Sequence, residues 1–217
     1  MADVKSIVFD LDGTLIDSVP AVAAAINRVL VEEGRLEVSV EAMRGMLGGG
    51  ALETMIQALQ ATGGGDEKLA TPLMERYFAA YLEDPSASTV VYPGVMDVLE
   101  GLRTNGVAMG ICTNKPGETT RPVLTALGLD KFFTAVLTPA DTHFPKPDGR
   151  HVLETLAAMG STIEGAFFVG DSEMDVMAAN DASIPVVCVT YGYCHVPFTE
   201  LKAIAFIDTF AELPGAF

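Results

Sequence analysis

The chain has 217 residues, of which 49% are hydrophobic and 19% are charged, and its formal net charge at pH 7 is −16. A chain of this length and composition folds into one large globular domain or two unequal ones. The acidic charge argues against a nucleic-acid partner, because phosphates are bound by basic surfaces. No apolar run approaches the roughly 18 residues of a membrane-spanning helix, which argues against a membrane partner.

The N-terminal residues and the cysteines favour a cytoplasmic protein. Residues 1–5 lack the basic region and the long apolar stretch of a signal peptide. The cysteines, Cys112, Cys188 and Cys194, are odd in number and have no metal-binding spacing. We therefore expect reduced thiols and a cytoplasmic location.

The first predicted element is a buried strand over the apolar run Ser6 to Phe9, which is followed by Asp10, Leu11, Asp12 and Gly13. Because alternate side chains of an extended strand share a face, the carboxylates of Asp10 and Asp12 point the same way. Such carboxylates repel each other unless a metal ion lies between them or one of them is protonated. A purely structural strand and turn can have the same residue pattern, so the choice between a functional and a structural role depends on the rest of the chain.

Residues 17–88 carry helical patterns and no convincing strand. We expect them to form a helical insertion, or cap, within a core made of residues 1–16 and 89–217, with linkers at residues 16–17 and 84–88. The predicted helices run from Ser18 to Gly34, from Ser39 onward, from Ala51 to Thr62 and from Asp66 to Leu82.

After residue 92, short apolar runs alternate with helical patterns. This alternation predicts an α/β fold with a Rossmann-like parallel sheet flanked by helices, to which the first strand, Val4 to Asp10, also belongs. The further predicted strands are Val107 to Thr113, Ala135 to Thr138, Ala166 to Val169, Pro185 to Thr190 and Ala205 to Ile207. The predicted helices between them are Gly117 to Leu127, Gly149 to Met159 and Met174 to Asn180.

Polar side chains follow several of these strands at the point where each strand ends. Open α/β sheets bind ligands beyond the carboxyl ends of their strands, so we expect these side chains to converge. Their carboxylates outnumber the single ammonium group, and a divalent cation would largely neutralise that excess. The residues are Asp10, Asp12, Thr113, Asn114, Lys146, Asp171 and Asp175.

In this order, the residues resemble the motifs of the haloacid dehalogenase superfamily of aspartyl-phosphate hydrolases, which carry a helical cap inserted after the first strand. The resemblance covers essentially the whole chain. The first motif is matched by Asp10 and Asp12, the second by Thr113, the third by Lys146, and the fourth by Asp171 and Asp175.

The resemblance implies covalent catalysis with Mg²⁺ as cofactor. Asp10 is expected to be the nucleophile, and Asp12 the general acid and base. Thr113, Asn114 and Lys146 are expected to bind the phosphoryl group. The expected metal site comprises Asp10, Asp12 through its main-chain carbonyl, Asp171, and Asp175, which would orient a metal-bound water or Lys146.

Several features narrow the substrate. Asp12 argues against the dehalogenases and phosphonate hydrolases of the superfamily, and the lack of histidine in residues 21–30 argues against its sugar phosphomutases. The chain most resembles phosphoglycolate phosphatases, through residues 48–51 (GGGA) and 190–193 (TYGY). We expect a phosphomonoester hydrolase acting on 2-phosphoglycolate or a similar small acidic ester. A sugar-phosphate phosphatase, a phosphomutase, and a non-catalytic binding protein are the alternatives.

The cap glycines precede the predicted helix Ala51 to Thr62, and free N–H groups at a helix start bind anions. We therefore expect Gly48, Gly49 and the nearest cap cation, Arg44, to bind the small phosphorylated metabolite. A flexible loop between helices is the alternative interpretation of the glycines.

Three histidines have no assigned role in this scheme. His143 and His195 are predicted to lie in loops near strand ends, from where either can approach the pocket. His151 stands beside Arg150 on a predicted helix, and we expect it at the surface.

Overall fold

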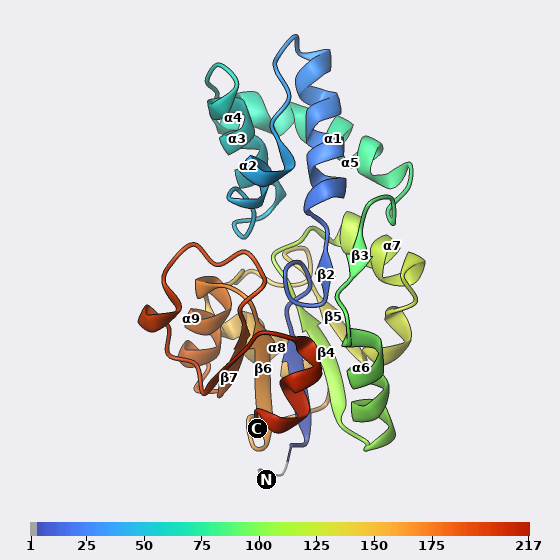
Figure 1. The fold of residues 1–217 in the computed structure, drawn as a ribbon, viewed down its shortest axis with the longest axis vertical. Coiled ribbons are helices and arrows are strands. Elements are labelled where there is room, and N and C mark those ends of the chain that lie inside the picture. The colour runs from blue at the N-terminus through green and yellow to red at the C-terminus, as the bar shows by residue number, and fades with distance from the viewer. Residues whose placement is uncertain (1–3) are drawn as a thin grey trace.

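The computed structural model describes residues 4–217 and is built around a six-stranded sheet (Figure 1). The strand order is β5-β4-β1-β6-β7-β8, and every neighbouring pair is parallel. The order reverses at β1, and open α/β sheets bind ligands at such a point. The strands are β1 (Ser6–Phe9), β4 (Ala108–Cys112), β5 (Ala135–Leu137), β6 (Ala166–Gly170), β7 (Val186–Val189) and β8 (Ala205–Ile207).

Both faces of the sheet are covered, and β1 shows how the sequence achieves this. Ile7 and Phe9 are buried in the hydrophobic cluster on one face, and Val8 is buried in the cluster on the other. The carboxyl ends of the strands are left facing the cap. The first face is covered by α6 (Val95–Thr104), α7 (Gly117–Ala126) and the 3-10 helix η4 (Phe210–Gly215), and the second by α8 (Gly149–Ala158) and α9 (Glu173–Asp181).

The helices between β2 (Ile16–Asp17) and β3 (Val90–Val91) form a cap with its own hydrophobic cluster. β2 and β3 pair antiparallel, so the segments that lead into and out of the cap lie side by side. Figure 1 shows the cap at the end of the molecule opposite the chain termini. The cap helices are α1 (Val19–Glu32), α2 (Val40–Arg44), α3 (Ala51–Ala61), α4 (Glu67–Ala70) and α5 (Met74–Leu82).

The structure confirms three predictions from the sequence: the α/β fold, the inserted helical cap and the strands of the parallel sheet. Helix α6 was missed, because it begins after Gly94, which offers no capping side chain. The last predicted cap helix is interrupted by a 3-10 turn at Thr71–Leu73, where Pro72 lacks the N–H that a continuous helix needs. None of the helices in the described part of the chain is long and apolar enough to cross a membrane.

Candidate active site

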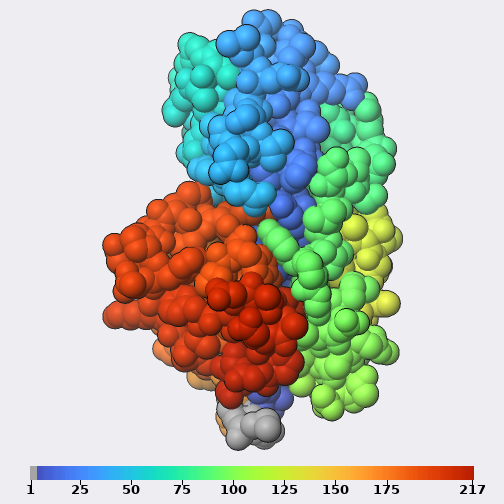
Figure 2. All heavy atoms as spheres, in the orientation of Figure 1, coloured from blue at the N-terminus to red at the C-terminus, as the bar shows by residue number. Residues whose placement is uncertain are grey.

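A pocket lies between the carboxyl ends of the strands and the cap. Figure 2 shows the atoms of the cap seated directly on those of the core. The pocket is lined by polar residues that follow β1, β4 and β6 and by the loop before α8. Among them are Asp10, Asp12, Thr113, Asn114, Lys146 and Asp171, all of which the sequence singled out.

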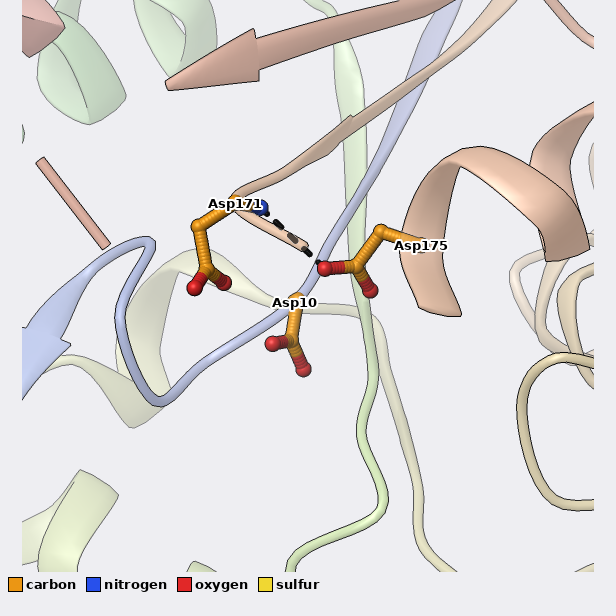
Figure 3. A group of neighbouring side chains, drawn as sticks. All are labelled: Asp10, Asp171 and Asp175. Atoms are coloured by element: carbon orange, nitrogen blue, oxygen red, sulfur yellow. Dashed lines mark hydrogen bonds between the residues drawn. The ribbon is translucent and has the colours of Figure 1, made fainter. Parts of the chain in front are cut away.

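The centre of the site is a cluster of buried carboxylates, Asp10, Asp171 and Asp175 (Figure 3). One oxygen from each residue lies within 4.8 Å of the others. Asp10 follows β1, Asp171 follows β6, and Asp175 stands in the first turn of α9. The parallel pairing of β1 with β6 places these ends next to each other.

Lys146 supplies the positive charge of the cluster. Its Nζ lies 2.7 Å from Oδ1 of Asp10 and 2.6 Å from Oδ1 of Asp175, and its side chain is 3% exposed. Burial by itself would lower the pKa of this ammonium, but the two carboxylates raise it above its usual range. Lys146 therefore stays protonated and holds Asp10 and Asp175 in fixed positions.

The second carboxylate oxygen of Asp175 accepts hydrogen bonds from the loop that precedes α9. Its Oδ2 accepts hydrogen bonds from the main-chain N–H groups of Asp171 (3.1 Å) and Ser172 (3.0 Å) and from the Ser172 hydroxyl (2.8 Å). This is a capping arrangement at the start of α9. Asp175 thus ties Lys146 to the segment that carries Asp171.

Asp171 is fixed from both sides. Its Oδ1 accepts from the Thr14 hydroxyl at 2.9 Å, and its Oδ2 accepts from the main-chain N–H of Tyr193 at 2.6 Å. Two glycines make room for it, because a Cβ on Gly13 would lie 2.4 Å from Asp171 Oδ2 and one on Gly192 would lie 2.2 Å from Asp171 Cβ. Gly13 also has a φ of 89°, which other residues rarely adopt.

The residues of the cluster fit a divalent metal ion. Burial raises the pKa of Asp10 to about 7 despite the pull of Lys146. Burial, together with the charges of Asp175 and Asp10, raises the pKa of Asp171 well above its ordinary value. A hard cation with oxygen ligands would relieve both effects, because it stabilises the ionised carboxylates.

The carboxylate of Asp12 lies outside this cluster and faces Lys115. The Nζ of Lys115 is 3.2 Å from Oδ1 and 3.1 Å from Oδ2 of Asp12. The Ser18 hydroxyl donates to Oδ1 at 2.6 Å, so Ser18 serves Asp12 and does not cap α1 with its side chain. Sequence reasoning missed Lys115, although its place two residues after Thr113 at the end of β4 was a usable signal.

Thr113 and Asn114 are engaged differently. The Oγ1 of Thr113 accepts the main-chain N–H of Lys115 at 3.1 Å, which leaves its own O–H available as a donor. The Asn114 amide bonds to the main chain of Lys146, donating to its carbonyl and accepting from its N–H, each at 3.0 Å. Asn114 therefore positions the Lys146 segment while also lining the pocket.

The predicted cap residues separate into two groups. Gly48 and Gly50 line the pocket, whereas Gly49 and Arg44 are not among its described lining residues. Arg44 forms an ion pair with Asp17 at 3.0 Å and lies 5.5 Å from the centre of the Tyr193 ring. It therefore links the cap to the core at the edge of the site.

The histidines lie outside the cluster. The prediction that His151 is at the surface is wrong, because the side chain is fully buried on the inner side of α8. His195 lies near the pocket rim, where its Nδ1 is 3.1 Å from Glu173 Oε1 and its Cε1 is 3.4 Å from the position of a Cβ on Gly48. His143 is exposed.

Comparison with known proteins decides the family. The model of the family described as haloacid dehalogenase-like hydrolase matches residues 7–189. The chain belongs to this family. It is 35% identical over 212 residues to a phosphoglycolate phosphatase of Caulobacter vibrioides, covering 97% of this chain and 90% of the relative. It is 40% identical over 219 residues to one of Pseudomonas putida, covering 97% and 79%.

Solved structures of similar proteins share the fold. A protein from Haemophilus somnus described as a predicted phosphoglycolate phosphatase aligns with a TM-score of 0.90 and 30% identity over 99% of this chain and 98% of that chain. CbbY from Rhodobacter sphaeroides, solved in complex with phosphate, aligns with a TM-score of 0.83 and 20% identity over 97% and 96%. At that identity the second likeness concerns the fold alone.

Proposed function

We propose that this protein is a Mg²⁺-dependent phosphatase that hydrolyses 2-phosphoglycolate, or a similar small acidic phosphate ester, by way of a phosphate carried on Asp10. The observation that carries the proposal is the buried carboxylate cluster with Lys146 at the point where the strand order reverses. A phosphomonoester is a dianion that carboxylates repel. A carboxylate cluster can therefore bind and attack it only when cations beside the carboxylates offset the negative charge. The names of the relatives supply the substrate class.

In the proposed reaction a carboxylate oxygen of Asp10 attacks phosphorus, and the bond between phosphorus and the ester oxygen breaks. Asp12 donates a proton to the leaving alkoxide. Water then attacks the phosphorus of the aspartyl phosphate, and Asp12 takes a proton from that water. Inorganic phosphate leaves, and both aspartates return to their starting states.

The other residues hold the phosphoryl group and the nucleophile. Lys146 binds a phosphoryl oxygen and offsets the charge that develops on it, and the free Thr113 O–H donates to another. Asp175 positions Lys146 through their 2.6 Å contact. Mg²⁺, which we propose is held by Asp10, Asp171 and the main-chain carbonyl of Asp12, neutralises and orients the phosphoryl group when bound.

The cap would enclose the leaving-group side of the substrate. We propose that it comprises residues 17–88 and that residues 1–16 and 89–217 form the catalytic core. Both connections run through the β2–β3 ribbon, so the cap can move about one short hinge. Pocket-lining cap residues such as Gly48, Gly50 and Tyr77 then contribute to substrate choice.

The test is a hydrolysis assay of the purified protein with Mg²⁺ over a panel of small phosphate esters. We expect phosphate release from 2-phosphoglycolate, its loss in excess chelator, and its loss in the Asp10→Asn variant. Better turnover of sugar phosphates would point to the sugar-phosphate alternative. Isomerisation without release of phosphate would point to a phosphomutase. Release of phosphate at full rate in excess chelator would overturn the proposal.

A further inference from the structure

We propose that Lys115 and Tyr77 form a second subsite that binds a carboxylate on the substrate, so that the pocket selects short phosphate esters with a second negative charge. This inference rests on the proposed function, because it takes the position of the phosphoryl group, at Lys146, from it. One member comes from the core and the other from the cap, and both line the same pocket.

Lys115 is a buried cation that the phosphoryl site does not use. Its side chain is 3% exposed, and apart from Lys146 no other lysine or arginine lines the pocket in residues 4–217. Its ammonium group pairs with the Asp12 carboxylate, and the residue lines the substrate pocket.

The pair between Lys115 and Asp12 is loose enough to share its cation. Its distances of 3.1 and 3.2 Å exceed the 2.6 and 2.7 Å contacts of Lys146 with its aspartates. They also exceed the roughly 2.7–2.9 Å of strong charge-assisted hydrogen bonds. An ammonium has three N–H donors, so Lys115 can bind a further carboxylate beside Asp12.

Tyr77 supplies a hydroxyl beside Lys115 in the pocket. It belongs to α5, lines the pocket, is 2% exposed as a residue, and forms no hydrogen bond through its hydroxyl with another residue in the described part of the chain. Burial raises the pKa of Tyr77, so its hydroxyl keeps its proton. Because Tyr77 lines the pocket, its O–H can donate to a ligand carboxylate there.

The surroundings of the subsite favour a short substrate. Apolar cap residues, Val22, Leu47 and Ala51, line the same pocket and offer no partner to the hydroxyl groups of a sugar. The ring of Tyr81 lies 4.9 Å from Lys115 Nζ and supports it from the cap side. The class of ligand that satisfies both Lys146 and Lys115 is the phosphate ester of a small hydroxy acid.

The experiment compares 2-phosphoglycolate with its carboxamide, 2-phosphoglycolamide, which has the same length but no second charge. We measure the ratio of their kcat/KM values for the wild type, Lys115→Met and Tyr77→Phe. We expect the wild type to favour the carboxylate, Lys115→Met to lower this ratio by about 10- to 100-fold, and Tyr77→Phe by about 2- to 10-fold.

Two matched variants serve as controls. Tyr81→Phe keeps the ring that lies near Lys115 and removes only a hydroxyl that is buried and unpartnered in residues 4–217, in a residue that does not line the pocket. Lys202→Met removes an exposed lysine. Both should keep the wild-type ratio. If Lys115→Met fails to fold by circular dichroism, Tyr77→Phe against Tyr81→Phe decides.

The outcomes separate this inference from the proposed function. If Lys115 acts only by holding Asp12, both esters lose activity by the same factor, the ratio is unchanged, and the inference is wrong while the phosphatase stands. A wild type that hydrolyses both esters equally well would also overturn it. If no ester released phosphate, the proposed function itself would be refuted.

Discussion

The hydroxyl of Tyr193 donates a hydrogen bond to Oδ1 of Asp17 at 3.0 Å. The main-chain N–H of the same tyrosine donates to Asp171 of the carboxylate cluster at 2.6 Å. Asp17 belongs to β2, which leads into the cap, and its Oδ2 accepts from Arg44 of α2 at 3.0 Å. One core residue therefore contacts both the cluster and the hinge of the cap.

We predict that Tyr193→Phe lowers kcat/KM by about 2- to 10-fold, because the hydroxyl donates to Asp17 and accepts from the main-chain N–H of Ser18, and both hydrogen bonds are lost. The variant frees Asp17 from the core and leaves the main-chain contact with Asp171 in place. The Mg²⁺ concentration that gives half-maximal activity should therefore stay at the wild-type value. Titrating Mg²⁺ against both proteins checks this, and a large rise in the Mg²⁺ requirement would contradict it.

Lys146 offers a test of the buried charges. We predict that Lys146→Met destabilises the fold by about 3–5 kcal/mol, because Asp10 and Asp175 then lack their common cation. kcat/KM should fall at least about 100-fold, as for loss of a donor to a transition-state oxygen.

The double variant Lys146→Met/Asp175→Asn separates these two effects. It removes one of the uncompensated charges, so it should recover part of the stability but none of the activity. Urea unfolding and phosphate release measure the two quantities. Recovery of activity in the double variant would show that Lys146 serves the fold alone.

Much of the site could be predicted because it follows from backbone order. Asp10 and Asp171 stand at the carboxyl ends of parallel strands, and the alternation of strands and helices predicts that these ends share one edge of the sheet. The adjacency of the two strands is seen only in the structure. The contact of Lys146 with Asp175 is one of the two roles that the family resemblance implied for Asp175, the other being to orient a metal-bound water. These placements depend on the position of a residue at the end of a strand, and that position can be read from the order of residues in the sequence.

The misses depend on side-chain direction and on distant partners. Lys115 turns toward Asp12, a residue 103 positions away, and no local pattern encodes that pairing. The ion pair of Arg44 with Asp17, 27 positions away, was not predicted either. His151 lies on the buried side of α8 with Thr155. Its charged neighbour Arg150 had suggested a surface position.

His151 makes stability depend on pH. Burial and the nearby charge of Lys146 lower its pKa to about 4, against an ordinary value of 6.5. The unfolded chain therefore binds a proton that the folded protein does not, and stability is lost as pH falls from about 6.5 toward 4. The contribution of this one group reaches about 3 kcal/mol at the acid end.

We predict that His151→Leu unfolds with a weaker dependence on pH than the wild type over this window. Urea unfolding near neutral pH and near pH 4.5 measures it, and other groups that titrate in this window cancel in the comparison. The exposed His143 provides the control, since His143→Leu should keep the wild-type dependence. If the free energy of unfolding changed equally with pH in all three proteins, His151 would make no contribution to the pH dependence of stability.

The two aspartates of the first motif should fail in different ways. Asp10→Asn should abolish turnover, because an amide does not attack phosphorus. Asp12→Asn should still release p-nitrophenol from p-nitrophenyl phosphate in a burst, because this leaving group needs little help from an acid. The later step should then be slow, since no base activates water. Stopped-flow absorbance resolves the burst, and near-normal turnover by Asp10→Asn would refute the covalent route.

The cap glycines provide a closely matched pair of variants. Gly50 is the N-cap of α3 with a φ of 93°, and a Cβ there would lie 3.4 Å from the main-chain oxygen of Asn114. Gly49 does not line the pocket and has no positive φ, and its Cβ would lie 3.0 Å from Cγ of Glu53. We therefore predict that Gly50→Ala costs about 1 kcal/mol of stability through backbone strain, whereas Gly49→Ala costs less.

Gly50→Ala should also lower kcat/KM several-fold more than Gly49→Ala, because Gly50 lines the pocket and relief of its strained φ would move the backbone that faces Asn114, the residue that holds the Lys146 main chain. The loss should appear with 2-phosphoglycolate and with p-nitrophenyl phosphate alike, since both depend on Lys146. Parallel assays of the two variants measure this. Equal losses for Gly49→Ala and Gly50→Ala, confined to 2-phosphoglycolate, would instead mean that the glycine loop binds the far end of the substrate.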